Sequence, residues 1–415
     1  MMRYKKLNIN RFILGGALLA LSSGMMNAQS RLSDGKWRGE FEAGSNRIPF
    51  VFLVANSATD SATVTLANGD ERVPLRGITY RGDSVFIPIQ AYDAELRGIV
   101  KGKTFDGRFV KHFIDNDSGV KFAAVKTDAP RFEKAGLPTS ISPDGEWDVN
   151  FIAPNGDIEK NVGTFQSRQQ IVTGSFLTDT GDLRFLEGAR TNNGFELSAF
   201  AGLSPYLVRI TFEGNDKFTG EFVTTRGVTR LSGIRNAKAT LQDPYSFTKV
   251  KGEEQKLNFT LPDVNGNQVS VTDAAYKGKV VIVSILGSWC PNCLDEMKFL
   301  VPWYNENKDR GVEIIGLAFE RKSDPEYAKR TLSSLEARYN VPYKILFAGK
   351  VGEETTSKVL PQLTKIVSYP TTIFLDKQGN VRKIHTGFNG PATGKFYEEF
   401  KEDFNATVNE LLNEK

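Results

Sequence analysis

The stretch VVIVSILGSWCPNC, residues 280–293, decides the fold of the C-terminal part of this 415-residue chain. Its first seven residues are mostly β-branched and apolar, which is typical of a strand. A short loop then leads to Cys290, and Pro291 stands where the first residue of a helix is expected. The spacing therefore predicts a strand that runs into a helix, with both cysteines of the chain in the first turn of that helix.

This position gives the two cysteines different chemistry. Backbone amides at a helix start, with their partial positive charge, favour a thiolate over a thiol. Cys290 is therefore predicted to be the exposed, acidic nucleophile. Cys293 follows three residues later, close enough to attack and resolve a mixed disulfide.

Two other uses of the pair are less favoured. A closed zinc site needs about four ligands, and the two histidines of the chain, His112 and His385, lack partner spacing. A purely structural disulfide would close a loop too short to restrain much of the unfolded chain. We therefore expect a reactive pair, with no metal and no cofactor.

Strands alternate with helices in the C-terminal domain, which is expected at 255–415 after a charged linker near 242–257. This pattern predicts a sheet covered by helices. Ser323 or Asp324, followed by Pro325, should begin one helix. The other expected elements are strands at 280–286, 313–319, 344–347, 371–376 and 381–385 and helices from about 291 and near 393–413.

The preceding region shows short alternating runs separated by GD, NG and DG turns, which predicts an all-β fold. A weak repeat recurs in it at offsets of about 110 residues. We therefore expect two tandem β-barrels or sandwiches, at 31–132 and 141–245, with Trp37 and Trp147 in their cores. The matched segments are DGKWRGEF (34–41) with DGEWDVNF (144–151), LRG (75–77) with LEG (186–188), and FDGRFV (105–110) with FTGEFV (218–223).

The N-terminus reads as a cleaved signal peptide at 1–28, with a basic segment, an apolar run and Ala28 before Gln29. An uncleaved anchor is the alternative reading. This segment holds four cations and no acid, so its removal takes the formal charge from +4 to zero. The remaining chain has no basic excess, which argues against a nucleic-acid partner. A periplasmic or cell-envelope location is expected.

Residues 257–412 resemble the TlpA/ResA type of exported, thioredoxin-fold thiol-disulfide oxidoreductases. LNFTLPDVNGNQVSVTDAAYKGKVVIVSILGSWCPNCLDEM carries the resemblance, which does not extend to the β region. It implies that Glu296 is a proton carrier near the pair and that Pro370 is the family's cis-proline. Spacing also places Glu296 beneath Cys293 on the same helix. Ser284 stands where thioredoxin has a buried aspartate.

Together these features predict a disulfide reductase for envelope proteins, in which Cys290, Cys293 and Glu296 are catalytic. Substrates are expected to contact four residues around the pair: Trp289, Pro291, Tyr369 and Pro370. The electron donor would be a membrane-borne or soluble thiol. Two alternatives remain: a peroxiredoxin-like peroxidase, and an envelope ligand-binding protein with an accessory thioredoxin-like domain.

Overall fold

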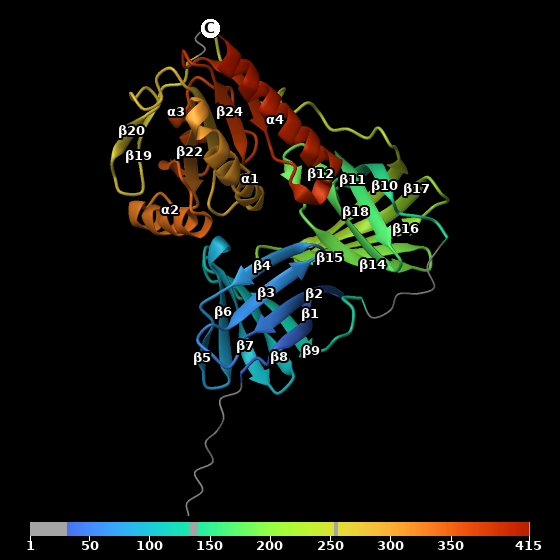
Figure 1. Cartoon of the computed structure of the whole chain (residues 1–415). Coiled ribbons are helices and arrows are strands. Elements are labelled where there is room, and N and C mark those ends of the chain that lie inside the picture. Colours follow the sequence, from blue (N-terminus) through green and yellow to red (C-terminus); the bar gives the residue numbers. More distant parts are fainter. Residues whose placement is uncertain (1–30, 133–139, 253–255, 415) are drawn as a thin grey trace, which may run out of the picture.

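The computed structural model describes residues 31–132, 140–252 and 256–414. They form three parts, drawn in blue, green and yellow to red in Figure 1. The first two are all-β and the third mixes strands with helices, as the sequence predicts. The expected signal peptide lies outside the described residues. None of the helices in the described part of the chain is long and apolar enough to cross a membrane.

The first part is an antiparallel sheet of nine strands within residues 31–132, in the order β4-β3-β2-β1-β9-β8-β7-β6-β5. Phenylalanines from several strands fill its inner face around Trp37, and the rings of Phe41 and Phe50 stack 4.3 Å apart. The strands are β1 (Gly35–Ala43), β2 (Asn46–Ala55), β3 (Thr63–Asn68), β4 (Glu71–Leu75), β5 (Thr79–Arg81), β6 (Ser84–Ile89), β7 (Ala94–Lys101), β8 (Thr104–Lys111) and β9 (Val120–Lys126), with the 3₁₀ turn η1 (Gln90–Tyr92) after β6.

The second part, within residues 140–252, is also an antiparallel sheet of nine strands, in the order β11-β10-β18-β17-β16-β15-β14-β12-β13. An additional pairing of β11 with β12 closes it into a barrel. The strands are β10 (Gly145–Ile152), β11 (Ile158–Arg168), β12 (Ile171–Thr178), β13 (Gly181–Asp182), β14 (Leu186–Thr191), β15 (Gly194–Phe200), β16 (Pro205–Phe212), β17 (Lys217–Thr224) and β18 (Gly227–Arg235).

The repeated tryptophans occupy matching places in the two sheets. Trp37 lies on β1 and Trp147 on β10, both are fully buried, and each indole nitrogen donates to a carbonyl four residues earlier at 2.9 Å. The third repeated segment falls on β8 and β17, which are the penultimate strands of their sheets along the chain. The second segment is less regular, because only the leucine of LRG lies on β4, as its last residue, whereas LEG forms the first three residues of β14.

The third part has a five-stranded sheet in the order β23-β22-β21-β24-β25, with β21, β22 and β23 parallel and β24 and β25 antiparallel. Helices α1, α2 and α4 cover one face, while β19, β20 and the end of α3 cover the other. The elements are β19 (Thr260–Pro262), β20 (Gln268–Ser270), β21 (Val280–Leu286), α1 (Pro291–Asn307), η2 (Lys308–Arg310), β22 (Val312–Glu320), α2 (Pro325–Tyr339), β23 (Lys344–Lys350), α3 (Glu353–Val359), β24 (Thr371–Leu375), β25 (Val381–Thr386), η3 (Pro391–Thr393) and α4 (Lys395–Asn413).

This arrangement matches the strand and helix order read from the sequence, including α2. Asp324 caps that helix by accepting from the Glu326 amide at 3.1 Å, and Pro325 is its first residue. Helix α3 and the β19–β20 pair were not expected, because seven- and three-residue elements are too short to show a period. The segment expected as a linker pairs with the third part, where the Lys251 amide donates to Gln362 O at 2.7 Å.

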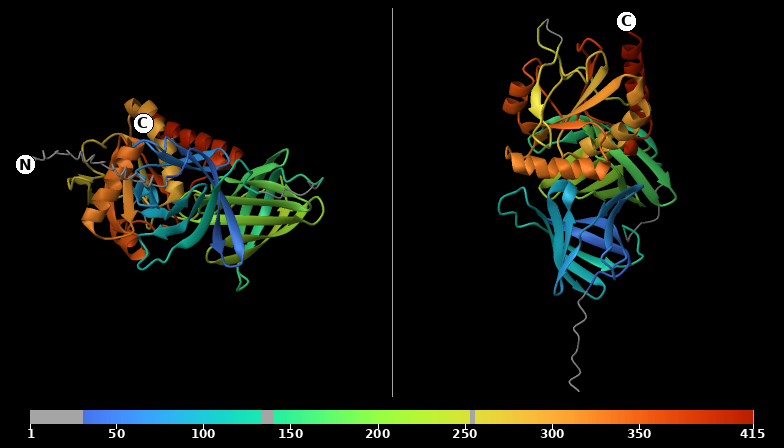
Figure 2. Two further views of the ribbon diagram at one scale, coloured as in Figure 1. Left: turned by 90° about the horizontal axis from the view of Figure 1, so that it is seen from below. Right: turned by 60° about the vertical axis from the view of Figure 1, so that its left-hand side comes forward.

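The two β sheets also contact each other and the third part (Figures 1 and 2). Phe200 of β15 inserts its ring into the aromatic core of the first sheet, 4.7 Å from Phe41 and 5.0 Å from Phe109. Below it, the Ser198 hydroxyl donates to Pro49 O at 2.6 Å. The hydrophobic core of the first sheet therefore includes a residue of the second sheet.

Candidate active site

Cys290 is the N-cap of α1, as the sequence predicts. The Cys293 amide donates to Cys290 Sγ at 3.2 Å, and Pro291 occupies the first helical position. The two cysteines form a disulfide. The helix start thus directs a backbone amide at the sulfur, which is the arrangement that stabilises a thiolate once the disulfide is reduced.

The structure differs from the sequence in how far Cys290 is exposed. Only 4% of Cys290 and 1% of Cys293 are accessible to solvent, whereas an exposed nucleophile was predicted. Both β parts contribute to the surroundings of the WCPNC motif, and no local sequence pattern reports such long-range contacts.

The loop before Cys290 is held by a buried acid that the sequence analysis missed. Glu320, at the end of β22, is fully buried and accepts from the Ser288 amide at 2.9 Å and from its hydroxyl at 2.7 Å. The Trp289 indole donates to Phe319 O at 2.9 Å. Burial raises the pKa of Glu320, and the Ser288 hydrogen bonds oppose that rise. The sequence signal that could have identified Glu320 is its position as an acid at the end of a mostly apolar strand.

The loop before β24 lies against the sulfur atoms. The Tyr369–Pro370 peptide bond is cis, and Cys290 Sγ lies 3.2 Å from Tyr369 O. The ring of Tyr369 lies 5.6 Å from that of Trp289. The structure therefore brings together Trp289, Cys290, Tyr369 and Pro370, although Cys290 and Tyr369 are 79 residues apart along the chain.

Glu296 lies one turn beyond Cys293 on α1 and only 1% of it is exposed. The Ser284 hydroxyl donates to its Oε2 at 2.7 Å, and the Thr372 hydroxyl donates to its Oε1. Burial raises the pKa of Glu296 to about 7, and the two hydroxyl donors oppose that rise. Its carboxyl group can therefore gain or lose a proton near neutral pH.

The turn between β12 and β13 packs on the same surface. The Ser368 hydroxyl donates to Thr180 O at 2.9 Å, and the Gly390 amide donates to Asp182 Oδ2 at 2.6 Å. The side-chain amide of Asn292, in the orientation that satisfies both groups, accepts from Asp182 N at 2.9 Å and donates to Asp182 O at 3.2 Å. The second β part thus contacts the inner dipeptide of WCPNC and the loops on either side of it.

Arg184, two residues after β13, contacts both the third part and the first β part. Its guanidinium donates to Pro291 O at 3.3 Å and to Tyr92 Oη at 3.3 Å. It also pairs with Asp295 at 3.2 Å and with Glu71 of β4. This buried arginine therefore connects all three parts of the protein beside the cysteine pair.

The first β part reaches the motif through η1. Arg321 donates to Tyr92 O at 3.3 Å, while its guanidinium lies 3.5 Å from the centre of the Phe113 ring and 5.6 Å from that of Trp289. Trp289 is thus covered by a cation held from the first sheet. This contact and the β12–β13 turn thus lie against the residues on either side of Cys290.

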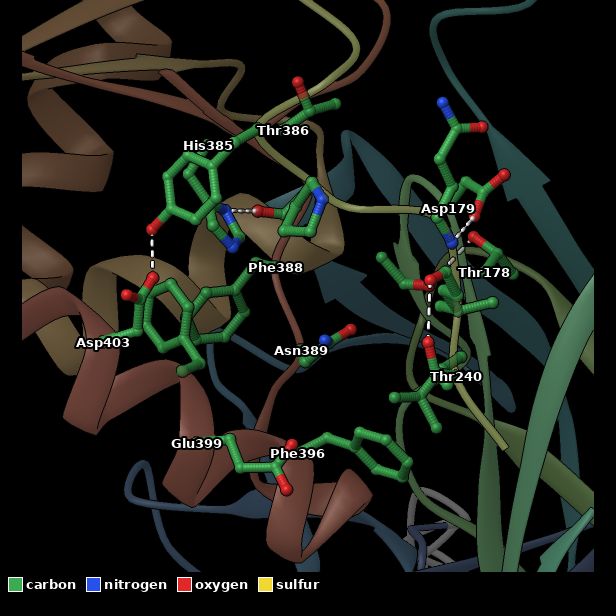
Figure 3. Close-up of a pocket in the computed structure, with 18 residues that line it drawn as sticks. Thr178, Asp179, Thr240, His385, Thr386, Phe388, Asn389, Phe396, Glu399 and Asp403 are labelled. Carbon is green, nitrogen blue, oxygen red and sulfur yellow. Dashed lines mark hydrogen bonds between the residues drawn. The ribbon is translucent and has the colours of Figure 1, made fainter. Parts of the chain in front are cut away.

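A cavity of about 310 Å³ opens beside the β12–β13 turn (Figure 3). Thr178 and Asp179 form one wall, and His385 and Asp403 lie across from them. Burial lowers the pKa of His385 to about 4, and its Nδ1 lies 3.1 Å from Gly387 O. His385 is therefore neutral near pH 7. Within the part of the chain that the structure describes, no cluster of three or more His, Cys, Asp or Glu side chains could hold a metal ion.

The third part and its cysteine pair define a thioredoxin-fold redox protein. The sequence profile of the AhpC/TSA family matches residues 253–384. The thiol-disulfide oxidoreductase ResA of Halalkalibacterium halodurans is 30% identical over 149 residues, which cover 36% of this chain and 74% of ResA. ResA of Bacillus thuringiensis subsp. konkukian is 27% identical over 164 residues, which cover 39% of this chain and 84% of that ResA. The chain therefore belongs, through its C-terminal part, to the ResA family of thiol-disulfide oxidoreductases.

Solved structures give similar partial matches. A thiol:disulfide interchange protein of the thioredoxin family from Chlorobium tepidum TLS is 21% identical, covers 40% of this chain and 100% of its own, and has a TM-score of 0.31. The thioredoxin domain of a thiol-disulfide oxidoreductase from Bacteroides vulgatus is 22% identical and has a TM-score of 0.28. The match covers 37% of this chain and 99% of that domain.

Proposed function

We propose that this protein is an exported disulfide reductase that acts on proteins of the cell envelope. The position of Cys290 at the start of α1 carries the proposal. Its sulfur accepts a hydrogen bond from the Cys293 amide at 3.2 Å. The signal-peptide pattern at 1–28 supports export. The proposed domains are two β domains, at 31–132 and 141–245, and a redox domain at 255–415. The two β domains would contact substrate or envelope partners.

The reaction moves two electrons from the reduced pair to a substrate disulfide. The Cys290 thiolate attacks one substrate sulfur, which forms a mixed disulfide and releases the other substrate sulfur as a thiolate. Cys293 then loses its proton to Glu296 and attacks Cys290 Sγ, which forms the Cys290–Cys293 disulfide and releases the second substrate thiol. A membrane-borne or soluble thiol donor reduces the pair again.

Four residues around the sulfur would hold the substrate. Trp289 and Pro291 lie on either side of Cys290, while Tyr369 and Pro370 supply the backbone opposite it. Pro370 has no amide hydrogen, so the Tyr369 backbone is the pairing partner for an extended substrate segment. Because the β12–β13 turn contacts this surface, such a segment has to fit beside Thr180 and Asp182 or displace them.

The test is reduction of insulin disulfides by the full chain in the presence of a dithiol. We expect catalysed reduction by the unchanged protein and the uncatalysed rate with Cys290→Ser. Equal rates for the two proteins would contradict the proposal.

A peroxidase is the second candidate, because the AhpC/TSA profile matches residues 253–384. The same two proteins should be tested for thiol-dependent consumption of hydrogen peroxide. Peroxide turnover that needs Cys290, without insulin reduction, would favour this alternative.

Glu296→Gln should slow disulfide exchange by about ten- to a thousandfold, the usual contribution of one acid–base group. In the unchanged protein the rate should rise as the pH passes through about 7, because the Glu296 carboxylate that accepts the Cys293 proton forms there. The variant should lack this rise. Glu306→Gln, an exposed glutamate on the same helix, is the matched control and should behave like the unchanged protein.

The same substitution should stabilise the fold at alkaline pH. Folding raises the pKa of Glu296 from 4.5 to about 7, so the native state loses stability as the pH rises from about 4.5 through about 7. Complete ionisation should cost on the order of 3–4 kcal/mol, and Gln avoids this cost. Denaturant unfolding at pH 5 and pH 8 measures the difference. A variant that is less stable than the unchanged protein at pH 8 would show that Glu296 is not held as a buried, neutral acid.

A further inference from the structure

A second and larger cavity, of about 610 Å³, lies between the first β part and helices α1 and α2. One wall consists of the end of β4 and the η1 turn, and the other consists of residues of the two helices. Its volume falls within the roughly 300–1,000 Å³ typical of ligand sites. We call it the cationic cleft, defined by Arg72, Arg76, Arg184, Lys298 and Arg338.

The charge of the cleft is strongly one-sided. Besides these five cations, its described lining contains no acidic side chain. Glu71 and Asp295 lie behind the lining, where both pair with Arg184. Asp295 also pairs with Lys298 at 2.7 Å. Two acids therefore offset part of the positive charge, and the remainder is open to a ligand.

Arg72 donates to the backbone carbonyls of Gly69 at 2.6 Å and Glu71 at 2.7 Å, which leaves Arg76 and Arg338 as the cations for a ligand. Arg76 belongs to the first β part and Arg338 to α2, so they approach the cleft from opposite walls. Among the described residues neither guanidinium has an ion-pair or hydrogen-bond partner, and both side chains are exposed. A guanidinium group binds carboxylates with paired hydrogen bonds, which gives it a preference for acidic groups of this kind.

Apolar side chains form the deeper surface between these charges. Leu75, Ile89, Tyr92 and Leu294 are buried and line the cleft. Leu294 directly follows Cys293, and Arg184 donates to Pro291 O at 3.3 Å. The cleft therefore extends along the first turn of α1, beside the redox pair, and combines an apolar floor with a cationic rim.

From this combination we infer that the cationic cleft binds an acidic, partly apolar polypeptide segment of the substrate, with carboxylates on Arg76 and Arg338 and apolar side chains on the floor. The inference rests on the proposed function, since it gives the reductase a preference for disulfides near acidic segments. The first β part would then select substrates instead of serving only as a support.

Binding can be measured without any redox step. The probe is a short, fluorescently labelled, cysteine-free peptide of alternating Glu and Leu, and its counterpart has Gln in place of Glu. At low salt the full chain should bind the acidic peptide about tenfold more tightly than its counterpart, and high salt should remove most of that difference. The double variant Arg76→Gln/Arg338→Gln should lose the preference.

The matched control is Arg168→Gln/Arg230→Gln, which removes the same charge from exposed positions on β11 and β18, outside the cleft. It should keep the preference for the acidic peptide. If the control loses as much affinity as the cleft variant, net charge explains the binding and the inference is overturned. Equal binding of the two peptides by the unchanged protein overturns it as well.

A kinetic measurement separates this inference from the proposed function. Peptides with one disulfide flanked by Glu or by Gln are compared by kcat/KM, and the cleft variant should lose the preference for Glu while reducing the Gln peptide normally. If neither peptide is reduced but the acidic probe still binds through Arg76 and Arg338, the proposed function fails and the binding site stands. If both peptides are reduced equally well, the cleft does not select substrates.

Discussion

Cys293→Ser is expected to accumulate a covalent complex with its substrate, whereas Cys290→Ser should form none. Cys290 caps α1 and receives the Cys293 amide at 3.2 Å, so its thiolate is the one that the helix start stabilises. Cys293 lies one turn inward and is 1% exposed, against 4% for Cys290. A substrate sulfur should therefore bond to Cys290, and without Cys293 no second thiol remains to release it.

The measurement is non-reducing electrophoresis of each variant after incubation with a disulfide-containing protein, followed by mass spectrometry of the linked peptide. Both variants should lack measurable turnover, so activity does not distinguish them, but the trapped complex does. Alkylation of the reduced, unchanged protein near neutral pH adds a second measurement and should label Cys290 first. Labelling of Cys293 first, or trapping through Cys293 in Cys290→Ser, would reverse the assignment.

The local geometry of the redox motif could be predicted from the sequence. A cysteine before a proline, after a strand and a short loop, indicates a helix cap, and the structure places Cys290 at that cap. Asp324 before Pro325 gave the start of α2 for the same reason. Such features depend on neighbouring residues and on backbone hydrogen bonds, which a short stretch of sequence contains.

The surroundings of the motif could not be predicted, because they come from distant segments. Asp182 and Arg184 lie more than a hundred residues before WCPNC, yet they contact Asn292 and Pro291. Neither residue stands in a motif, and their burial appears only once the second sheet packs on the third part. The sequence wrongly suggested an exposed thiol, since Cys290 is only 4% exposed in the structure and such contacts lie against the residues next to it.

The partners of Glu296 show an intermediate case. Its place on the helix could be derived from spacing, whereas the Ser284 and Thr372 hydroxyls that donate to it come from neighbouring strands of the sheet. In the sequence, Ser284 is distinctive only because it stands where thioredoxin has an aspartate. In the structure the Ser284 hydroxyl donates to the Glu296 carboxyl group. A serine in place of the aspartate and a glutamate on the neighbouring helix thus form one hydrogen-bonded pair.

Trp147→Ala should destabilise the second β part by about 3–5 kcal/mol, the usual cost of removing a large buried aromatic side chain. Trp147 is fully buried, its ring centre lies 5.0 Å from that of Phe218 and 6.0 Å from that of Phe212, and its indole donates to Pro143 O at 2.9 Å. The conservative Trp147→Phe is the matched control and should cost clearly less, since it keeps an aromatic ring in the core.

The location of the damage should differ between the two repeated tryptophans. Trp147 lies in a core cluster formed only by residues of the second sheet, so Trp147→Ala should raise hydrogen exchange there and leave the first sheet protected. Trp37 belongs to the aromatic core into which Phe200 inserts. Trp37→Ala should therefore loosen the first sheet and also β15, the strand that carries Phe200.

Hydrogen exchange followed by mass spectrometry resolves these patterns strand by strand. If Trp147→Ala exposes both sheets equally, in a single cooperative transition, the β region folds as one unit and the proposed division near residues 133–140 is wrong.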